Sequence, residues 1–449
     1  MDTPVAPEPS LPASAGSDGA RAAGRRRSGR VRALMIFNTV VAIITIAAGS
    51  GLLYANWKLG SRQVVTIDSA SGDGNIDLPA GDLSAKNYLI TGSDNTACID
   101  PDSPFAGGFG DRSAFGERSD SIMVVRVSPR DGTAAILSFP RDLWVTEAGS
   151  TRKNRINANF NKKDPNRLIR TIKQNFGIPI DHYVNIDFCT FKDVVDAVGG
   201  VRVPFPFKAR DKRTGFKVMK AGACATLRGD EALAYIRSRK YDFYDPMTGK
   251  WTRDGTSDWG RINRQQDFIK RMTRKALDRA RTNPKVASEI MNATLENVIT
   301  DDRITPLMLL QLGQAMKNYD AGTMGSYTMP GTGQMIEEMA VIVPELESEI
   351  AKKIIALYRG EASLATRAST TTTVPRPVPT VPTESAAGTS GATPAFIGAA
   401  ATILGALGSR TTGATPPTTS PATTTTIPAV VIEQNPRGIV PPNDPACPY

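Results

Sequence analysis

The 449-residue chain contains one histidine, His182, and four cysteines, none of which forms a CxxC pair. A zinc site needs several histidine or cysteine ligands at close spacing, and a histidine-dependent hydrolase needs a histidine at its site. His182 lies in the strand-like run DHYVNIDF, where we interpret it as a structural residue. Neither chemistry is therefore supported, which leaves carboxylates and arginines as the candidate functional groups.

Positive charge is plentiful, with a formal net charge of +10. Six arginines fall between residues 21 and 32, and the other basic residues are spread through the middle of the chain. Such a balance is compatible with nucleic-acid binding. Only residues 1–32 are predicted, from the membrane topology described next, to lie in the cytoplasm. They show no folded DNA-binding motif, so we disfavour cytoplasmic DNA binding.

Residues 33–57 carry no formal charge and are rich in Ile, Val, Leu and Ala. A stretch of this length can cross a ~30 Å hydrocarbon core as one helix. Because the arginines precede it and only Lys58 and Arg62 follow closely, we predict a cytoplasmic N-terminus and an extracytoplasmic remainder. A cleaved signal peptide is the alternative, for which both the stretch and its N-terminal flank are long. We expect a single-pass plasma-membrane protein.

Composition predicts five segments. We expect a disordered cytoplasmic tail, a transmembrane helix, a stalk, a globular domain and a Thr/Pro/Ala-rich tail, over residues 1–32, 33–57, 58–85, 86–360 and 361–449. From Pro428 the sequence regains apolar residues, so we expect its end to dock on the globular domain.

All four cysteines fall on the predicted outer side. Four cysteines in an oxidising compartment permit two disulfides in three connectivities. We favour Cys189–Cys224 with Cys98–Cys447, in which Cys447 would attach the returning C-terminal segment.

Within the globular part, strand-like runs alternate with helical ones. NYLITGS, SIMVVRVS, AAILSF, YVNIDF and VRVPF are typical of strands. Asp164-Pro165 is expected to open a helix that Gly177 ends, and FKDVVDAV, GDEALAY and residues 261–281 are further helices. The alternation predicts a layered α/β fold, a mixed sheet flanked by helices.

Two aspartates stand at expected strand ends. Asp94 follows one strand in GSDN, and Asp120 precedes another in ERSDS. Carboxylates at strand ends can converge on one edge of a sheet, and Mg²⁺ favours one or two carboxylates with phosphate oxygens and water. The alternative is ordinary turn chemistry.

Arginines occupy comparable positions. Arg141 follows a strand in FPRD, where its planar fork suits phosphate, although a salt bridge to Asp142 is an equal alternative. Arg237 and Arg239 in YIRSR share one face with Tyr235 if that segment is extended, and would then face one ligand.

The long helix presents a polar stripe. Arg261, Arg264, Gln265 and Phe268 recur at helical spacing, and an apolar phase, Ile262, Ile269, Met272 and Ala276, should face the core. We expect Ser257 or Asp258 to cap the helix start, whose positive end also attracts anions.

In this order and spacing, the motifs resemble the LytR–CpsA–Psr family of cell-envelope phosphotransferases. The resemblance covers about residues 86–360 and is carried by KNYLITGSD, ERSDSIMVVRV, ILSFPRDLWV, NRINANF, YVNIDF, VVDAVGGVRV, LRGDEALAYIRSR and DWGRINRQQDFI. One departure is the long aromatic segment at residues 240–260, for which a lid, a glycan-binding loop and an inert insertion all remain open.

The resemblance implies transfer of a glycopolymer from a polyprenyl-pyrophosphate carrier to a peptidoglycan hydroxyl, forming a phosphodiester. Asp94 and Asp120 would hold Mg²⁺. The pyrophosphate oxygens would be gripped by Arg118, Arg141, Arg237, Arg239, Arg261 and Gln265, with Arg155 at the family's lysine-like position. Ile156, Phe160, Phe188 and Phe191 could line a polyprenyl tunnel, or belong to the core. The alternatives are a polyprenyl-pyrophosphate phosphatase using water, or a non-catalytic envelope-binding or regulatory protein.

Overall fold

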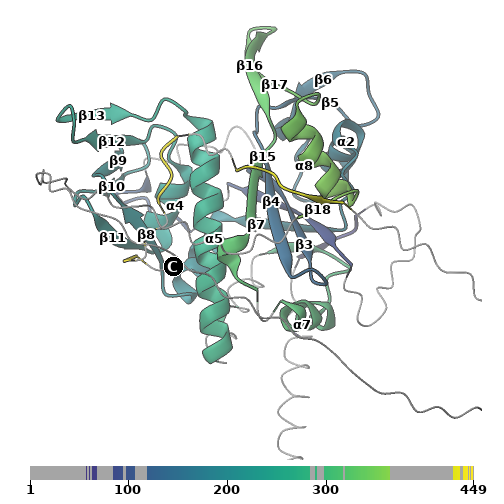
Figure 1. Cartoon of the computed structure of the whole chain (residues 1–449), viewed down its shortest axis with the longest axis horizontal. Coiled ribbons are helices and arrows are strands. Elements are labelled where there is room, and N and C mark those ends of the chain that lie inside the picture. The colour runs from purple at the N-terminus through teal and green to yellow at the C-terminus, as the bar shows by residue number, and fades with distance from the viewer. Residues whose placement is uncertain are drawn as a thin grey trace, which may run out of the picture. The chain divides into compact units, whose positions relative to one another are not determined.

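A seven-stranded mixed sheet is the centre of the fold in this computed structural model (Figure 1). The structure describes residues 63–67, 84–94, 98–106, 119–283, 289–290, 298–316, 319–364, 428–434, 438–442, 444 and 446–447, with Trp57 and Gly60. The strands lie in the order β1 (Gln63–Val65), β14 (Ile299–Asp301), β7 (His182–Asp187), β2 (Lys86–Ser93), β3 (Ser119–Ser128), β4 (Thr133–Phe139) and β15 (Gly325–Thr328). The strands expected at NYLITGS, SIMVVRVS, AAILSF and YVNIDF are confirmed.

The register of this sheet brings four strand ends to one edge. β2 and β4 each pair with β3 in antiparallel fashion, so both end where β3 begins. β7 runs parallel to β2, with Ser93 opposite Asp187, and ends at the same edge. We call it the site edge.

Helices cover both faces of the sheet. On one face, α2 (Asn166–Phe176) and α8 (Glu349–Arg359) bury Ile172 and Tyr358 against Leu89 and Val124. On the other face, α5 (Asp258–Thr282) and α7 (Pro306–Ala315) pack against Met123 and Ile136. Alternate residues of one strand serve the two faces, as the pleat requires.

A second hydrophobic core lies on the far side of α5. It joins Phe268 of α5 to α3 (Phe188–Ala197), α4 (Gly229–Arg237) and the paired strands β8 (Val201–Phe205) and β11 (Ala223–Leu227). Helix α5 therefore stands between the large sheet and the smaller elements (Figure 1). The helix thus packs against hydrophobic cores on two sides, not on the single core face that its sequence predicted.

Smaller elements complete the fold. A four-stranded sheet has the order β10 (Phe216–Val218), β9 (Ala209–Asp211), β12 (Asp242–Asp245) and β13 (Lys250–Arg253). The two-stranded pairs are β5 (Trp144–Thr146) with β6 (Lys153–Arg155), β16 (Gly331–Ile336) with β17 (Met339–Pro344), and β18 (Ser363–Leu364) with β19 (Ala429–Val430). The short 3-10 helices are η2 (Ile156–Asn159) and η3 (Ala321–Thr323). Within the 240–260 segment, residues 242–253 thus form a hairpin that extends a small sheet.

Helix boundaries agree with the sequence signals in part. Gly177 ends α2 in the left-handed region at φ 67°, as expected, and Asp164 accepts a bond from the Asn166 amide. The prediction that the side chain of Ser257 or Asp258 caps the start of α5 is wrong. Ser257 makes no side-chain capping bond and has φ 49°, while Asp258 is already the first helical residue.

The expected membrane helix, residues 33–57, lies outside the described residues except for Trp57. Within the described ranges, no helix combines the length and apolarity that crossing a bilayer requires.

The C-terminal segment returns to the globular part, but through a different cysteine pair from the one we favoured. The disulfides join Cys98 to Cys189 and Cys224 to Cys447. The prediction was wrong because β2 and β7 are neighbouring parallel strands, so the segments that follow them, with Cys98 and Cys189, leave the sheet together. Cys447 instead reaches Cys224 on β11.

Candidate functional site

Asp120 is the centre of the candidate site. It occupies an irregularity in the β2–β3 pairing, where Gly92 faces Ser121 but Ser93 faces Ser119. A bulge leaves one residue without a ladder partner and redirects its side chain, which is why bulges are frequent beside active sites. The Asp120 side chain is thereby placed at the site edge, 14% exposed.

Arg141 reaches Asp120 because of strand register. Ile122 pairs with Phe139, so two residues further along, past Pro140, Arg141 lies beside Asp120. Its Nη1 donates to Asp120 Oδ1 at 2.9 Å, and its Nε donates to Asp142 at 3.3 Å. The carboxylates of Asp142 and Asp120 outweigh burial and raise the pKa of Arg141. The salt bridge to Asp142 that we weighed as an alternative is thus present together with the Asp120 contact.

Arg239 approaches Asp120 from another part of the chain. Its Nη2 donates to Asp120 Oδ1 at 3.3 Å, and its Nε lies 3.0 Å from Asp258 Oδ1. Arg261 Nη2 lies 3.0 Å from the same Asp258 oxygen. Asp142, which bonds to Arg141, also pairs with Arg155, whose Nε lies 3.5 Å from it. Seven charged groups therefore form one alternating series, which we call the arginine cluster: Arg155, Asp142, Arg141, Asp120, Arg239, Asp258 and Arg261.

Burial and the close packing of opposite charges shift the pKa values of Asp120 and Arg239. Burial raises the pKa of Asp120, but the charges of Arg261, Arg239 and Arg141 exceed that effect and hold the pKa well below its usual range. Burial and the neighbouring Arg261 lower the pKa of Arg239 to about 10, against the opposing carboxylates. Asp120 is therefore ionised and a weak base, whereas Arg239 is a cation that a further anion would stabilise.

Exposure divides the cluster into two layers. The side chains of Arg141 and Arg239 are 29% and 30% exposed, so their guanidinium groups can meet a ligand. Arg261 is 2% exposed and acts from beneath. Its buried Nε has no hydrogen-bond acceptor among the described residues. A buried donor of this kind is costly unless a partner satisfies it.

Asp94 directly follows β2 at the site edge and is buried, 6% exposed. The pairing of Ser93 with Ser119 places it near the start of β3, which carries Asp120. Cys98, four residues further along the chain, is joined by a disulfide to Cys189 at the start of α3. Two carboxylates at one edge, one of them held ionised, fit the one or two that Mg²⁺ takes beside phosphate oxygens and water. No cluster of three or more potential metal ligands occurs among the residues described.

Arg237 and Arg239 do not share one extended face. The segment YIRSR is the end of helix α4, which stops at Arg237, so the expectation of an extended run was wrong. Tyr235 is buried in the second core, and the Arg237 guanidinium lies 4.6 Å from the ring centre of Phe188. Arg239 makes the ion pairs with Asp120 and Asp258 that define the cluster.

The residues of the polar stripe of α5 have different partners and do not all face the cluster. Arg264 is buried and bonds to Asp254 at 2.8 Å and to the Ser238 carbonyl at 2.8 Å. The Gln265 amide donates to the Ile236 carbonyl at 3.1 Å. These two side chains hold α5 against the preceding segment, and Arg261 is the member of the stripe that reaches the cluster. Arg118 lies outside the described residues.

The four candidate tunnel residues are core residues here. Ile156 and Phe160 pack in the main core, Phe191 packs in the second core, and Phe188 is buried with Leu233.

Sequence reasoning did not assign Asp142 and Asp258 to the site, although both had been noted. The available signal was proximity: Asp142 follows Arg141, and Asp258 lies one helical turn before Arg261.

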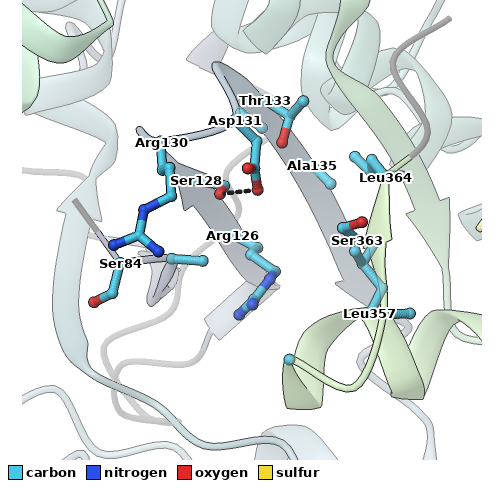
Figure 2. A pocket seen from close by; sticks show the side chains of 14 residues that line it. Ser84, Arg126, Ser128, Arg130, Asp131, Thr133, Ala135, Leu357, Ser363 and Leu364 are labelled. Carbon is cyan, nitrogen blue, oxygen red and sulfur yellow. Dashed lines mark hydrogen bonds between the residues drawn. The ribbon is translucent and has the colours of Figure 1, made fainter. Parts of the chain in front are cut away.

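A separate pocket of about 260 Å³ lies between β3, β4, α8 and β18 (Figure 2). Arg126, Ser128 and Asp131 line it, with the Ser128 hydroxyl donating to Asp131 at 2.6 Å. Asp120 and Ser128 stand near opposite ends of the 10-residue strand β3, which at about 3.3 Å per residue spans roughly 30 Å. The pocket is thus distinct from the arginine cluster.

Together the fold and the cluster define an α/β protein with an arginine-rich site at one sheet edge. The LytR_cpsA_psr family model matches residues 66–355. The chain therefore belongs to the LytR–CpsA–Psr family.

Curated relatives carry related names. Polyisoprenyl-teichoic acid–peptidoglycan teichoic acid transferase TagV of Bacillus subtilis (strain 168) is 36% identical over 205 residues, 43% of this chain and 47% of TagV. The match thus spans about half of TagV. A TagU transferase of the same description from Halalkalibacterium halodurans is 29% identical over 283 residues, 62% of this chain and 83% of that protein.

Solved structures of the family are also similar. The LytR-Csp2A-Psr enzyme from Actinomyces oris has a TM-score of 0.48 at 22% identity, covering 66% of this chain and 96% of that one. The TagV structure from B. subtilis has a TM-score of 0.47 at 25% identity, covering 62% and 98%.

Proposed function

We propose that the protein transfers a glycopolymer phosphate from a polyprenyl-pyrophosphate carrier to a peptidoglycan hydroxyl, with Mg²⁺ held by Asp94 and Asp120. The observation that carries the proposal is the convergence of Arg141, Arg239 and Arg261 on the ionised Asp120. Phosphoryl transfer relies chiefly on positioning and on neutralising charge, which is what such a cluster supplies. The names of the curated relatives support the same donor and acceptor.

In the proposed reaction, the acceptor oxygen attacks the phosphorus that bears the sugar. The P–O bond to the second phosphate breaks, and polyprenyl phosphate leaves with the electron pair. Arg141 and Arg239 orient the phosphate oxygens, while Arg261 adds charge from beneath. A bound Mg²⁺ would neutralise charge on the pyrophosphate. Because the pKa of Asp120 is so low, we assign it to holding cations, and the hydroxyl proton passes to solvent.

The proposed location is extracytoplasmic. Two disulfides support it, because such bonds persist in oxidising compartments and are rare in the cytosol.

The test incubates the full chain with Mg²⁺, a lipid-pyrophosphate-linked oligosaccharide and peptidoglycan oligomers, and measures phosphodiester-linked product. We expect product from the wild type, and a rate lower by on the order of 10²–10³ in Arg141→Ala, as for loss of one oxyanion donor. Arg274→Ala, which removes a 38% exposed arginine of the same fold from a 3.7 Å ion pair, is the matched control and should keep the wild-type rate.

Two other results would contradict the proposal. Free phosphorylated sugar without coupled product would identify a phosphatase that uses water. Donor binding without any turnover would identify a non-catalytic envelope-binding protein.

A further inference from the structure

The C-terminal segment crosses the fold beside the start of α5. We call the described residues 438–442 the strap; Cys447, slightly further along, is joined to Cys224 of β11, with the two Cα atoms 5.5 Å apart. Ile439 of the strap packs against the second core, and the Pro442 carbonyl accepts a bond from Arg271 of α5 at 3.2 Å. The strap is therefore attached to both α5 and β11.

The start of the strap contacts a buried acid, Asp254, which lies four residues before Asp258 of the arginine cluster. The Ile439 amide donates to Asp254 Oδ2 at 3.2 Å, the oxygen that also accepts from Arg264 at 2.8 Å. Arg264 Nη1 lies in addition 3.4 Å from the Ile439 carbonyl. Burial raises the pKa of Asp254, but bonds from Thr256, Arg264 and the Ile439 amide lower it overall. The strap thus supplies part of the hydrogen bonding that keeps this buried carboxylate ionised.

Two glycines show how closely the chain is packed around Asp254. A Cβ on Gly438 would lie 2.2 Å from Thr256 Oγ1 and 2.7 Å from Asp254 Oδ2, and its φ is +85°. A Cβ on Gly260 would lie 2.6 Å from the same Asp254 oxygen. Asp254 is therefore enclosed between the strap and the first turn of α5.

That first turn carries the cluster. Asp258 and Arg261 stand on either side of Gly260, and Arg239 bonds to Asp258. The turn is preceded by Ser257 at φ 49°, an uncommon conformation for a residue with a side chain. Such a conformation persists where the surroundings over-determine it.

We propose that Gly438 and Ile439 are positioning residues for the arginine cluster. By holding Asp254 and Arg264, the strap sets the first turn of α5 and so places Asp258 and Arg261 beneath Asp120 and Arg239. The choice of a pyrophosphate ligand rests on the proposed function, whereas the mechanical coupling between strap and helix does not.

The test compares two glycine variants of the full chain. Gly438→Ala puts a Cβ into the Asp254 contact, whereas Gly132→Ala imposes similar backbone strain at φ +60° with no atom within 4 Å. Affinity for inorganic pyrophosphate with Mg²⁺ is measured by calorimetry. We expect Gly438→Ala to weaken binding about tenfold, less than the roughly 10²-fold that a 1 Å misplacement of positioning groups can cost. Gly132→Ala should bind like the wild type.

Hydrogen exchange of the peptide 259–264 provides a readout that needs no ligand. It should become faster in Gly438→Ala and stay at the wild-type rate in Gly132→Ala. If the wild type does not bind pyrophosphate, the proposed function fails, while the exchange rates still test the strap.

Equal effects of the two glycine variants, on binding and on exchange, would overturn the positioning role, because they would reflect strain alone. If Gly438→Ala does not fold, the paired variant Cys224→Ser/Cys447→Ser, which frees the end of the strap, replaces it. Unchanged exchange at 259–264 in that variant would equally overturn the proposal.

Discussion

At the scale of single residues, Asp120 determines how the site is organised. It lies at an irregularity of strand pairing, and Arg141 and Arg239 both donate to its Oδ1. Mutual repulsion between the arginines is offset by this carboxylate and by Asp258. The removal of either acid should therefore affect stability as well as ligand binding.

The variant Asp120→Asn tests whether the negative charge of Asp120 stabilises the folded protein. The folded pKa of Asp120 lies below the unfolded value of about 3.9, so its charge stabilises the protein above that pH. The contribution is lost as pH falls through the folded pKa. In urea unfolding we expect Asp120→Asn to be less stable than the wild type at pH 7, with the difference shrinking below about pH 4.

Glu347→Gln serves as the control, because the Glu347 side chain is 94% exposed and should contribute little. A difference between Asp120→Asn and the wild type that does not change with pH would show that the Asp120 charge is not what stabilises the cluster.

Some site residues could be predicted from the sequence because strand ends were recognisable. Arg141 follows β4 and Asp120 is the second residue of β3, so their meeting requires only antiparallel pairing. Arg237 could not be placed correctly, because its spacing from Arg239 has opposite meanings in a helix and in a strand. Gln265 has the right chemistry for an anion, and the structure shows one donor of its amide bonded to the Ile236 carbonyl.

At the scale of elements, α5 connects the site to the rest of the fold. It packs against the large sheet on one side and against the second core on the other. Its arginines Arg261, Arg264 and Arg271 are buried for this reason, and each needs a partner. The polar stripe predicted from the sequence therefore exists, but Arg264 and Gln265 bond to the segment that precedes α5.

Arg264→Ala should be strongly destabilising. The Arg264 and Asp254 side chains are 1% and 3% exposed, and removing one partner leaves the other buried and charged. We expect the free energy of unfolding to fall by about 3–5 kcal/mol, measured by urea denaturation.

Arg274→Ala on the same helix removes an exposed ion pair with Asp320 and should cost at most about 1 kcal/mol. Similar losses in the two variants would mean that the buried pair has no special role in holding α5.

At the scale of the whole molecule, the disulfides show how distant segments are joined. Cys98–Cys189 spans a sequence separation of 91 and joins the segment of Cys98 to α3, whereas Cys224–Cys447 spans 223 and attaches the C-terminal segment. Non-reducing peptide mapping of the full chain should recover these two pairs. Recovery of Cys189 joined to Cys224 would contradict the structure.

The removal of one bridge should lower stability through chain entropy. For a loop of the length closed by Cys98–Cys189, the paired variant Cys98→Ser/Cys189→Ser should lose about 4–5 kcal/mol of unfolding free energy. Reducing agent should have little further effect at that site, which distinguishes the bond from other consequences of the substitutions.

The sequence by itself determined the alternation of strands and helices, the ends of several elements and the kind of ligand to consider. These depend on periodicity, on turn residues and on the chemistry of arginine and aspartate, all of which are local. Only the tertiary structure decided which arginines meet Asp120, which cysteines pair, and that the C-terminal strap supports the start of α5. Those contacts join residues far apart in the chain, and their geometry follows from sheet register and from burial of α5 on two sides.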